Sequence, residues 1–344
     1  MENIQRTELG EIGEFGIIDR IKNAFHLQNT TSLLGIGDDA AIIEKNENEV
    51  LLVSTDTLSE GIHFDLTYTP LKHLGYKSVA VNLSDIAAMN GKPSQILVNL
   101  ACSNRFSVEA IEELYVGIKL ACDKYKVDLI GGDTTSSRAG LVISVTAIGT
   151  ADKNKVVKRS GAQNHDLICV SGDLGAAYAG LQVLEREKQE FLANPDMQPE
   201  LEGKDYIVER QLKPEARVDI IEQLEQLEIL PTSMIDISDG LASEIMHICK
   251  ASGVGADIYE EKIPIDNLTY ETAREFDIDP LTYMMNGGED YELLFTIKQS
   301  DFDKIRNNPF FCVIGHIKDA GSGINLISKG GNTHPIKAQG WRHF

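Results

Sequence analysis

Five short segments of this chain set aspartate among glycine, serine and threonine, a mixture that suits a site for hard cations. They are GIGDDAA (35–41), STDTLSEGIHFD (54–65), NLSDIAAM (82–89), GGDTTSS (131–137) and IDISDG (235–240). A carboxylate beside small residues is typical of a tight turn with exposed backbone N–H groups, where oxygen ligands can hold a divalent cation. One such segment is usually an ordinary turn or helix cap. Five of them across about 200 residues instead predict one shared site, in which several Mg²⁺ ions hold a polyphosphate.

The familiar nucleotide-binding motifs are missing from the chain. The P-loop pattern fails where Pro93 follows Lys92, the dinucleotide pattern GxGxxG fails where Asp38 follows Gly37, and protein-kinase signatures are missing too. If the protein handles a nucleotide, metal ions must replace the usual lysine, because a triphosphate carries about four negative charges that the aspartates would repel. In-line phosphoryl transfer needs mainly such positioning and charge neutralisation.

Length and charge bound the class of protein. At 344 residues the chain is longer than one hydrophobic core usually allows, so we expect two domains of about 150 residues each. Its 42% hydrophobic and 25% charged residues are typical of a soluble globular protein. The formal net charge of −21 argues against nucleic acid as a partner, because no basic stripe is present to neutralise phosphates.

The cysteines and the N-terminus predict a cytoplasmic protein that has no contact with a membrane. The five cysteines are isolated and show no CxxC spacing, which indicates reduced core residues rather than disulfides or a zinc site. The N-terminus alternates in charge without a hydrophobic signal region, and no apolar run reaches the roughly 18 residues that a membrane span needs.

Apolar periodicity predicts the elements that must position the acidic segments. Helices are expected at 10–25, 71–89 and 108–125, and strands at 41–43, 50–53, 94–101 and 141–148. The charged, unpatterned segment Asp152–Ser160 is the best candidate for a linker. We therefore predict an α/β chain with mixed α+β sheets and two domains, residues 1–150 and 151–344.

The second half follows a similar alternation of strands and helices. Strands are expected at 166–170, 256–259, 291–297 and 311–317, and helices at 175–186 and 214–227. Pro214 suits the first turn of its helix, and Ser238 or Asp239 is expected to cap a helix that runs to Lys250.

Seven segments, in their order and at their intervals, carry a resemblance over nearly the whole chain. They are GIGDDAA, VSTDTLSEGIHF, AVNLSDIAAM, LIGGDTT, KRSGA, IDISDGL and GGEDYELLF. The chain resembles the thiamine-monophosphate kinases of the aminoimidazole-ribonucleotide-synthetase-like superfamily from about Gly13 to Phe344. The seven segments together are highly specific, although Ser-Asp-Gly-Leu or Gly-Gly-Asp alone is not.

The resemblance implies ATP-dependent phosphorylation of thiamine monophosphate to thiamine diphosphate, the final step of thiamine diphosphate biosynthesis. The substrate phosphate would attack the γ-phosphorus of ATP directly, with no phospho-enzyme. The resemblance also implies a homodimer built through the N-terminal domains, with ATP and Mg²⁺ in the cleft between the two domains of each chain. No general base is expected, because the attacking phosphate oxygen is already anionic near neutral pH.

Carried over position by position, the resemblance implies three groups of site residues. The metal ligands would be Asp39, Ser54, Thr55, Asp56, Asp85, Asp133, Asp236 and Asp239, and among them Asp85, Asp236 and Asp239 would act directly in catalysis. The nucleotide contacts would be Gly132, Asp133, Arg159 and Ser238, with Tyr115 as a further candidate. The contacts to thiamine monophosphate would be His63, Glu289 and Trp341.

Four of these residues have both a functional and a plainer interpretation. Arg159 offers a forked cation that suits a phosphate oxygen, or is a solvated charge of the linker. His63 follows an acidic segment closely enough to reach the same cleft, or is structural. Glu289 faces the cationic thiazolium ring, or simply ends its loop. Trp341 stacks on the aminopyrimidine or the thiazolium ring, or docks onto its own domain.

Other members of the superfamily fit less well. Residues 1–34 lack the reactive cysteine expected of a selenophosphate synthetase, and the C-terminal Phe344 stands where the hydrogenase-maturation relative ends in cysteine. Purine-biosynthesis cyclo-ligases do not combine STDTLSEGIHF with GGEDYELLF. A different class, a non-catalytic acidic module that binds Ca²⁺ or Mg²⁺, predicts metal binding without nucleotide dependence. Against it, the acidic segments are dispersed and form no EF-hand loop.

Overall fold

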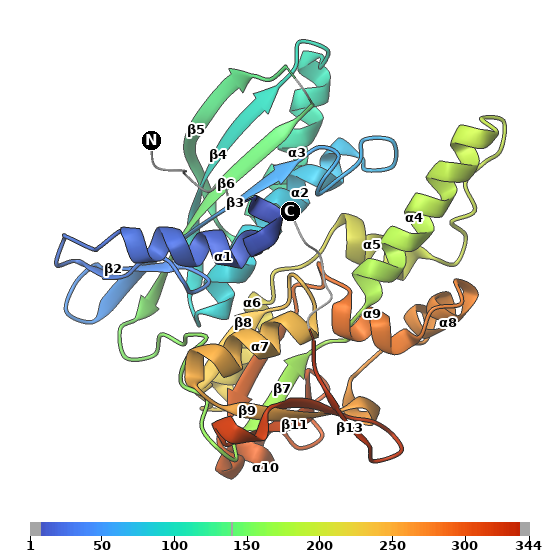
Figure 1. Ribbon diagram of the computed structural model, residues 1–344. Coiled ribbons are helices and arrows are strands. Elements are labelled where there is room, and N and C mark those ends of the chain that lie inside the picture. The colour runs from blue at the N-terminus through green and yellow to red at the C-terminus, as the bar shows by residue number, and fades with distance from the viewer. Residues whose placement is uncertain (1–7, 139, 338–344) are drawn as a thin grey trace, which may run out of the picture.

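The protein has two mixed β-sheets, each covered by helices, which confirms the α/β class. The structure is a computed structural model that describes residues 8–138 and 140–337. In Figure 1 the sheet of the N-terminal half lies at the top and the sheet of the C-terminal half at the bottom. The segment 153–166 between them forms neither helix nor strand. The division at residue 150 stays a prediction.

The first sheet has six strands in the order β1-β2-β3-β6-β4-β5. Their bounds are β1 Ser32–Leu34, β2 Ala41–Glu44, β3 Glu49–Ser59, β6 Val142–Asp152, β4 Lys92–Cys102 and β5 Asp128–Ser136. Only the β4–β5 pair is parallel. Burial alternates along β3, with Val50 and Leu52 packed into the core of this half. One face of the sheet is therefore covered and the other is open, as period-2 alternation predicts.

Helices α2 (Leu71–Ala88) and α3 (Val108–Tyr125) cover this sheet and cross each other at two glycines. A Cβ at Gly75 would lie 2.0 Å from the Leu114 carbonyl oxygen, and one at Gly117 would lie 1.9 Å from that of Lys72. Each glycine thus lets the backbone of one helix touch that of the other. No rotamer change can make room for a methyl group, because both neighbours are backbone atoms.

The glycine crossing gives a first prediction, on stability. Gly117→Ala is expected to lower the free energy of unfolding by about 2–3 kcal/mol, because the two helices must move apart. Urea unfolding followed by circular dichroism measures this change. The matched control is Gly321→Ala, where nothing lies within 4 Å of the new methyl group and a change of less than about 0.5 kcal/mol is expected. Equal midpoints for the two variants would contradict the crossing.

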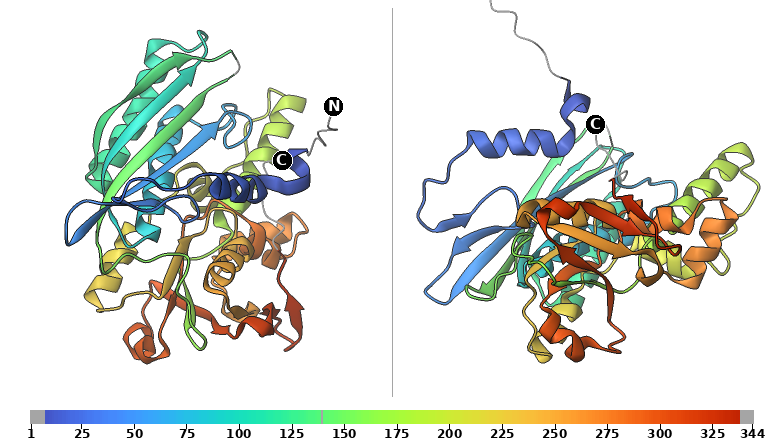
Figure 2. Two further views of the ribbon diagram at one scale, coloured as in Figure 1. Left: turned by 60° about the vertical axis from the view of Figure 1, so that its left-hand side comes forward. Right: turned by 60° about the horizontal axis from the view of Figure 1, so that its bottom comes forward.

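The second sheet has seven strands in the order β13-β12-β9-β11-β7-β10-β8. Their bounds are β13 Thr333–Pro335, β12 Ile324–Ile327, β9 Gly255–Tyr259, β11 Phe311–Lys318, β7 Leu167–Ser171, β10 Leu293–Ile297 and β8 Ser233–Asp236. The helices around it are α4 Ala176–Ala193, α5 Asp205–Leu212, α6 Val218–Gln226, α7 Leu241–Ser252, α8 Asn267–Glu275, α9 Pro280–Asn286 and α10 Phe302–Ile305. The C-terminal end of helix α4 lies at the outer edge of the molecule in Figure 1 and in the right-hand view of Figure 2, whereas its N-terminal turns are buried.

Helix α2 belongs to both halves of the molecule. It buries 14 of its 18 residues, although it is not apolar on all sides. Val79, Leu83 and Ile86 pack into the core of the first sheet, whereas Ala87 and Ala88 pack with Phe295 and others in a core of the second half. The C-terminal turn of α2, which carries the NLSD segment, therefore lies where the two sheets approach each other.

Helix α1 (Leu9–Ala24) connects the first half to α7 of the second. It is kinked at Gly13, whose φ of 65° is left-handed. The Phe15 ring lies 4.5 Å from the ring of His247, and Asp19 pairs with Lys250 at 3.2 Å. None of its residues is fully buried, so this amphipathic helix lies on the surface of the protein.

Most of the predicted elements are confirmed, and two local expectations are wrong: that the acidic segments are turns and that Pro214 lies in the first turn of its helix. The helix at 108–125 has the predicted bounds. Residues 54–59 and 131–136 form strands and 82–88 belong to a helix, so three of the five acidic segments are not turns. Helix α6 begins at Val218, which leaves Pro214 outside it.

Within 8–138 and 140–337, no helix is long and apolar enough to cross a membrane.

Candidate active site

Three carboxylates meet where the two halves of the molecule join. Asp39 lies in the turn before β2, Asp85 in the last turn of α2, and Asp236 at the end of β8. Each places a carboxylate oxygen within 4.8 Å of the others. The Ser84 hydroxyl of α2 donates to Asp236 Oδ2 at 2.6 Å and so ties the halves together at this point. Separate segments of the chain therefore build one acidic cluster, hereafter the carboxylate cluster.

One cation faces the carboxylate cluster, and it comes from the connecting segment. Arg159 donates from Nε and Nη2 to Asp39 Oδ1 at 3.0 and 2.6 Å, and its backbone N–H donates to Asp38 Oδ1 at 3.1 Å. The Asp39 side chain has no exposed surface. Two ionised carboxylates whose oxygens lie within 4.8 Å of each other, as in the carboxylate cluster, repel each other by roughly 3 kcal/mol at an effective dielectric constant near 20. The single positive charge of Arg159 cannot balance the negative charges of all three aspartates.

Burial and mutual repulsion raise the pKa of each acid in this region. Burial raises the pKa of Asp39 to about 7 against the opposing effect of Arg159, and it raises the pKa of Asp236 to about 6. The pKa of Asp56 rises to about 6 through burial and the charge of Glu14, and that of Asp85 rises well above its ordinary range through burial and Asp56.

One oxygen of the carboxylate cluster lacks a partner. Asp39 Oδ2 is buried and accepts no hydrogen bond from any residue that the structure describes. Carboxylates that are crowded, raised in pKa and short of donors fit a divalent cation with oxygen ligands. The donor set is therefore suited to Mg²⁺.

The raised pKa values predict how pH and Mg²⁺ act on stability. An aspartate in the unfolded chain titrates near pH 3.9, about two to three units below these folded values. The stabilising contribution is therefore complete below about pH 4 and is lost as pH rises through 6–7, where the buried groups ionise. Mg²⁺ binds the ionised form, so the gain in Tm on adding Mg²⁺ should be several degrees larger at pH 8 than at pH 5.5.

Thermal unfolding in EDTA and in MgCl₂ at the two pH values measures this difference. Choline chloride at equal ionic strength is the control for screening of charges. An equal gain in Tm at pH 5.5 and pH 8 would show that the cluster binds no cation in exchange for protons.

The neighbours of the carboxylate cluster are arranged by the pleat of β3. Ser54 and Asp56 lie on the face that packs against α2; the Ser54 hydroxyl donates to Asp85 Oδ2, and Asn82 Oδ1 accepts the backbone N–H of Asp56 at 2.9 Å. The side chain of Thr55 points to the opposite face, where Oγ1 donates to the Val145 carbonyl at 3.0 Å. Ser54 and Asp56 thus adjoin the cluster, whereas the Thr55 hydroxyl does not.

The Ser-Asp-Gly turn is held in a way that corrects the expected cap. The N-cap of α7 is Gly240, and no side chain caps it. Instead Glu244 Oε1, in the first turns of α7, accepts the backbone N–H groups of Ser238 and Asp239 at 3.2 and 2.8 Å. This contact fixes the turn from inside the protein. Asp239 is not among the three aspartates whose carboxylate oxygens lie within 4.8 Å of one another.

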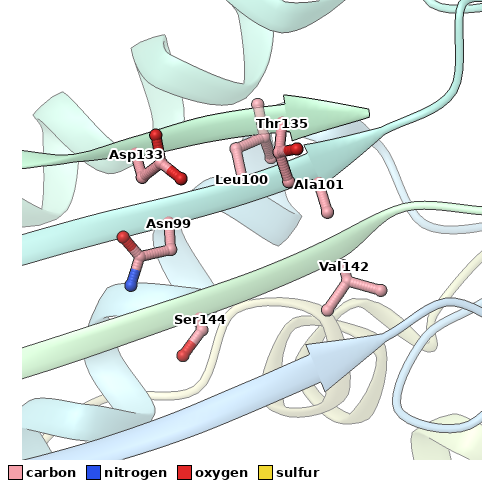
Figure 3. Close-up of a pocket in the computed structure, with 7 residues that line it drawn as sticks. All are labelled: Asn99, Leu100, Ala101, Asp133, Thr135, Val142 and Ser144. Carbon is pink, nitrogen blue, oxygen red and sulfur yellow. The ribbon is translucent and has the colours of Figure 1, made fainter. Parts of the chain in front are cut away.

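Gly132, Asp133 and Tyr115 lie apart from the carboxylate cluster. Asp133 on β5 lies opposite Asn99 on β4, which in turn lies opposite Ser144 on β6. All three side chains are on the open face of the sheet (Figure 3). These residues line a hollow of about 290 Å³. Strand β5 is three strands away from β3, which carries Ser54 and Asp56, so about 14 Å separates the two strands at the usual strand spacing. A Cβ at Gly132 would lie 1.8 Å from the Val98 carbonyl oxygen, so only glycine fits there. Tyr115 packs against the first core from α3.

The expected substrate residues occupy different places. His63 lines a hollow of about 1080 Å³ with Asp56 and with Glu14 and Ile18 of α1. Its Nδ1 accepts the backbone N–H of Ser59 at 3.1 Å, which leaves the proton of a neutral ring on Nε2. Glu289 lies in the loop between α9 and β10, with 25% of its side chain exposed. Trp341 lies outside the residues that the structure describes.

Sequence reasoning did not single out several residues that the structure places at the site. Ser84 and Asn82 stand inside the quoted NLSD segment, so their hydrogen-bonding side chains were a usable signal. Glu14 raises the pKa of Asp56 from α1, more than forty positions away, and nothing in the sequence connects the two. Glu244 follows the N-cap Gly240 by four residues, not by the three of a capping box, and its Oε1 accepts backbone N–H groups that precede the cap.

Comparisons with known proteins identify the family of the chain. The family AIR synthase related protein, N-terminal domain, matches residues 37–151, and AIR synthase related protein, C-terminal domain, matches residues 163–324. Thiamine-monophosphate kinase of Aquifex aeolicus is 36% identical over 98% of this chain and 99% of its own length. Thiamine-monophosphate kinase of Bacillus subtilis is 32% identical over 90% of this chain and 93% of its own.

Solved structures are similar to this chain as well. The structure of AaThiL complexed with AMPPCP and TMP is similar with a TM-score of 0.84 and 33% identity, over 98% of this chain and 99% of that one. The hydrogenase maturation protein HypE in complex with ATP matches with a TM-score of 0.65 at 17% identity over 84% of each chain, which shows a shared fold.

Proposed function

This chain belongs to the AIR synthase related family and to the thiamine-monophosphate kinases within it, and from that premise we propose how it carries out the reaction. A phosphate oxygen of thiamine monophosphate attacks the γ-phosphorus of ATP in line. The bond between the γ-phosphorus and the β,γ-bridging oxygen breaks, and ADP and thiamine diphosphate result. The product makes this the final step in forming thiamine diphosphate.

The carboxylate cluster is the observation that carries this mechanism. Asp39, Asp85 and Asp236 would hold Mg²⁺ with help from Ser54 and Asp56, because they are crowded and Asp39 Oδ2 has no hydrogen-bond donor. Bound Mg²⁺ supplies neutralisation and orientation of the phosphate oxygens. Thr55, Asp133 and Asp239 would complete the set of metal ligands around the triphosphate. Several ions are needed, since Asp133 on β5 lies too far from the carboxylate cluster to share an ion with it.

The remaining residues bind and orient the two substrates. Arg159 would exchange part of its contact with Asp39 for a phosphate oxygen, and Ser238 would contact the nucleotide beside the carboxylate cluster. Gly132 and Tyr115, which lie apart from the cluster, would contact more distant parts of the nucleotide. His63, Glu289 and Trp341 would hold thiamine monophosphate. No side chain needs to remove a proton, because the attacking oxygen is anionic near neutral pH, so alignment supplies most of the rate.

We also propose that two copies of the chain pair through the N-terminal half. The edge strand β5 is exposed along its whole length. Leu129 and Ile130 of β5 have 42% and 57% of their surface exposed, and Val116 and Leu120 of α3 have 47% and 44%. An exposed edge strand flanked by apolar side chains favours a second copy as its cover. The cytoplasmic location stays a prediction.

The deciding experiment follows thiamine diphosphate by chromatography. The purified protein is incubated with MgCl₂ and ATP, with and without thiamine monophosphate, and Asp239→Asn is assayed in parallel. Product that requires both substrates and is lost in the variant would support the proposal. ATP cleavage without thiamine diphosphate would change the acceptor, and metal binding without any nucleotide dependence would indicate a binding module instead.

A further inference from the structure

Lys77 is a buried cation that the proposed mechanism does not use. It lies in the middle of α2, and only 2% of its side chain is exposed. Its ammonium lies 2.8 Å from Glu289 Oε1 and donates to the Gln211 carbonyl oxygen at 3.2 Å. Both partners belong to the C-terminal half. A lysine buried to this extent requires an ionised partner, because an unpaired ammonium out of water is strongly unfavourable.

The Glu289 carboxylate is fixed at both of its oxygens. Oε1 pairs with Lys77 from α2, and Oε2 accepts Gln211 Nε2 from α5 at 2.7 Å. A carboxylate has about four accepting positions, so each oxygen retains one. The side chain of Glu289 is 25% exposed, whereas that of Lys77 is 2% exposed. Lys77 and Gln211 therefore hold the carboxylate from the inside of the protein, and its open side faces away from them.

The backbone of Glu289 is constrained as well. Its φ of 65° is in the left-handed region, and its N–H donates to the Ser238 carbonyl at 2.7 Å. A Cβ at Gly288 would lie 2.4 Å from the same carbonyl oxygen, so the Gly-Gly-Glu loop rests directly on the Ser-Asp-Gly turn. Any rotation of the Glu289 side chain away from the cleft must therefore break its contacts with Lys77 and Gln211 rather than move the loop.

We propose that Lys77 is a positioning residue that holds the Glu289 carboxylate toward the site of the cationic substrate ring. This rests on the proposed function, in which Glu289 contacts thiamine monophosphate. Lys77 itself does not touch the substrate. It acts through Glu289 by fixing the direction of the carboxylate before the substrate arrives, so that less freedom is lost on binding.

The test is a double-mutant cycle on the full-length protein in saturating Mg²⁺ and ATP, with thiamine monophosphate varied. Lys77→Met is expected to raise KM for thiamine monophosphate about 10-fold, to change kcat less than about 3-fold, and to leave KM for ATP unchanged. In the background of Glu289→Gln, the same Lys77→Met change should alter KM less than 2-fold, because the group through which Lys77 acts is already altered. Lys72→Met, at an exposed position of the same helix, is the matched control and should behave as the unaltered protein.

Each outcome of the cycle is decisive. An equal KM effect of Lys77→Met in both backgrounds, or no effect in either, would overturn the proposal. A loss confined to kcat and Tm would show that the ion pair is only structural. Lys77→Met leaves the partly buried Glu289 carboxylate without its cation, so folding of the variant is checked by circular dichroism. If it does not fold, the double variant Lys77→Met/Glu289→Gln carries no unpaired charge and is compared with Glu289→Gln alone. A KM raised more than 3-fold by the added Lys77 change would then overturn the proposal, and an equal KM would support it.

The cycle also separates this inference from the proposed function. If the unaltered protein forms no thiamine diphosphate, the proposed function fails before Lys77 is tested. If the unaltered protein is active and Glu289→Gln leaves KM for thiamine monophosphate unchanged, Glu289 does not contact the substrate. The positioning role of Lys77 is then refuted as well.

Discussion

Asp85→Asn is expected to lower kcat on the order of 10³-fold and, in the absence of metal, to raise the melting temperature of the protein. The two effects have one cause. Asp85 lies within 4.8 Å of Asp39 and Asp236, and its pKa is raised well above the ordinary range by burial and by Asp56. A buried acid of this kind opposes folding near neutral pH and is useful only when a cation binds to it. The neutral amide removes the repulsion and the metal ligand together.

Initial rates with saturating ATP and thiamine monophosphate and thermal unfolding in EDTA measure the two effects. The control is Asp123→Asn, since Asp123 is exposed on α3 and forms an ion pair with Lys119 on the surface of the same helix. It should change neither quantity measurably. A kcat within 10-fold of the unaltered protein, or a clear fall in Tm in EDTA, would show that the carboxylate cluster is a structural network rather than a cation site.

Arg159→Met should have the opposite effect on stability and a loss of activity of about 10²-fold. The guanidinium makes both of its hydrogen bonds to the buried oxygen of Asp39, so its removal leaves that acid without a cation. Truncating one member of a buried pair costs about 3 kcal/mol or more when the other stays charged. Because burial raises the pKa of Asp39 to about 7, the loss of stability should be larger at pH 8, where the acid is ionised, than at pH 5.5.

Urea unfolding at both pH values and the rate of thiamine diphosphate formation give this result directly. Arg159→Lys keeps the charge but not the fork, and should recover stability more than activity. Arg105→Met, at an exposed position of the first half, is the matched control. A loss of stability that is equal at pH 5.5 and pH 8 would mean that Arg159 acts by packing and not through the charge of Asp39.

The sequence predicted long, strongly periodic elements well and short or polar ones poorly. The helix over 108–125 was predicted to the residue because its apolar positions recur every three or four residues. Strand β5 was not predicted, because an edge strand made of Asp128–Ser136 has no buried face and hence no alternation. Pro214 suits a helix start by its fixed φ, yet the helix begins only at Val218. Tertiary contacts decide such cases.

At the site, too, some features could be predicted from the sequence and others depend on tertiary contacts. The aspartates of all five acidic segments were expected to converge, and Asp39, Asp85 and Asp236 of three segments do so. Asp56 adjoins them, whereas Asp133 lies apart on the edge strand β5. Ser84 and Asn82 stand inside the NLSD segment, but the more distant supports could not be predicted, because they come from elements whose relative placement the sequence does not encode locally. Lys77 lies in a helix that looks ordinary, and its partner Glu289 is more than two hundred positions away. Only the packing of α2 against the second half brings them together.

Helix α2 also determines how the chain unfolds. Because its side chains fill cores on both sides and 14 of its 18 residues are buried, neither half can separate without exposing it. Its backbone amides should therefore exchange with deuterium only through global opening, at the slowest rate in the molecule. The two sheets then behave as one cooperative folding unit, and an isolated N-terminal half would carry an uncovered apolar helix face and aggregate.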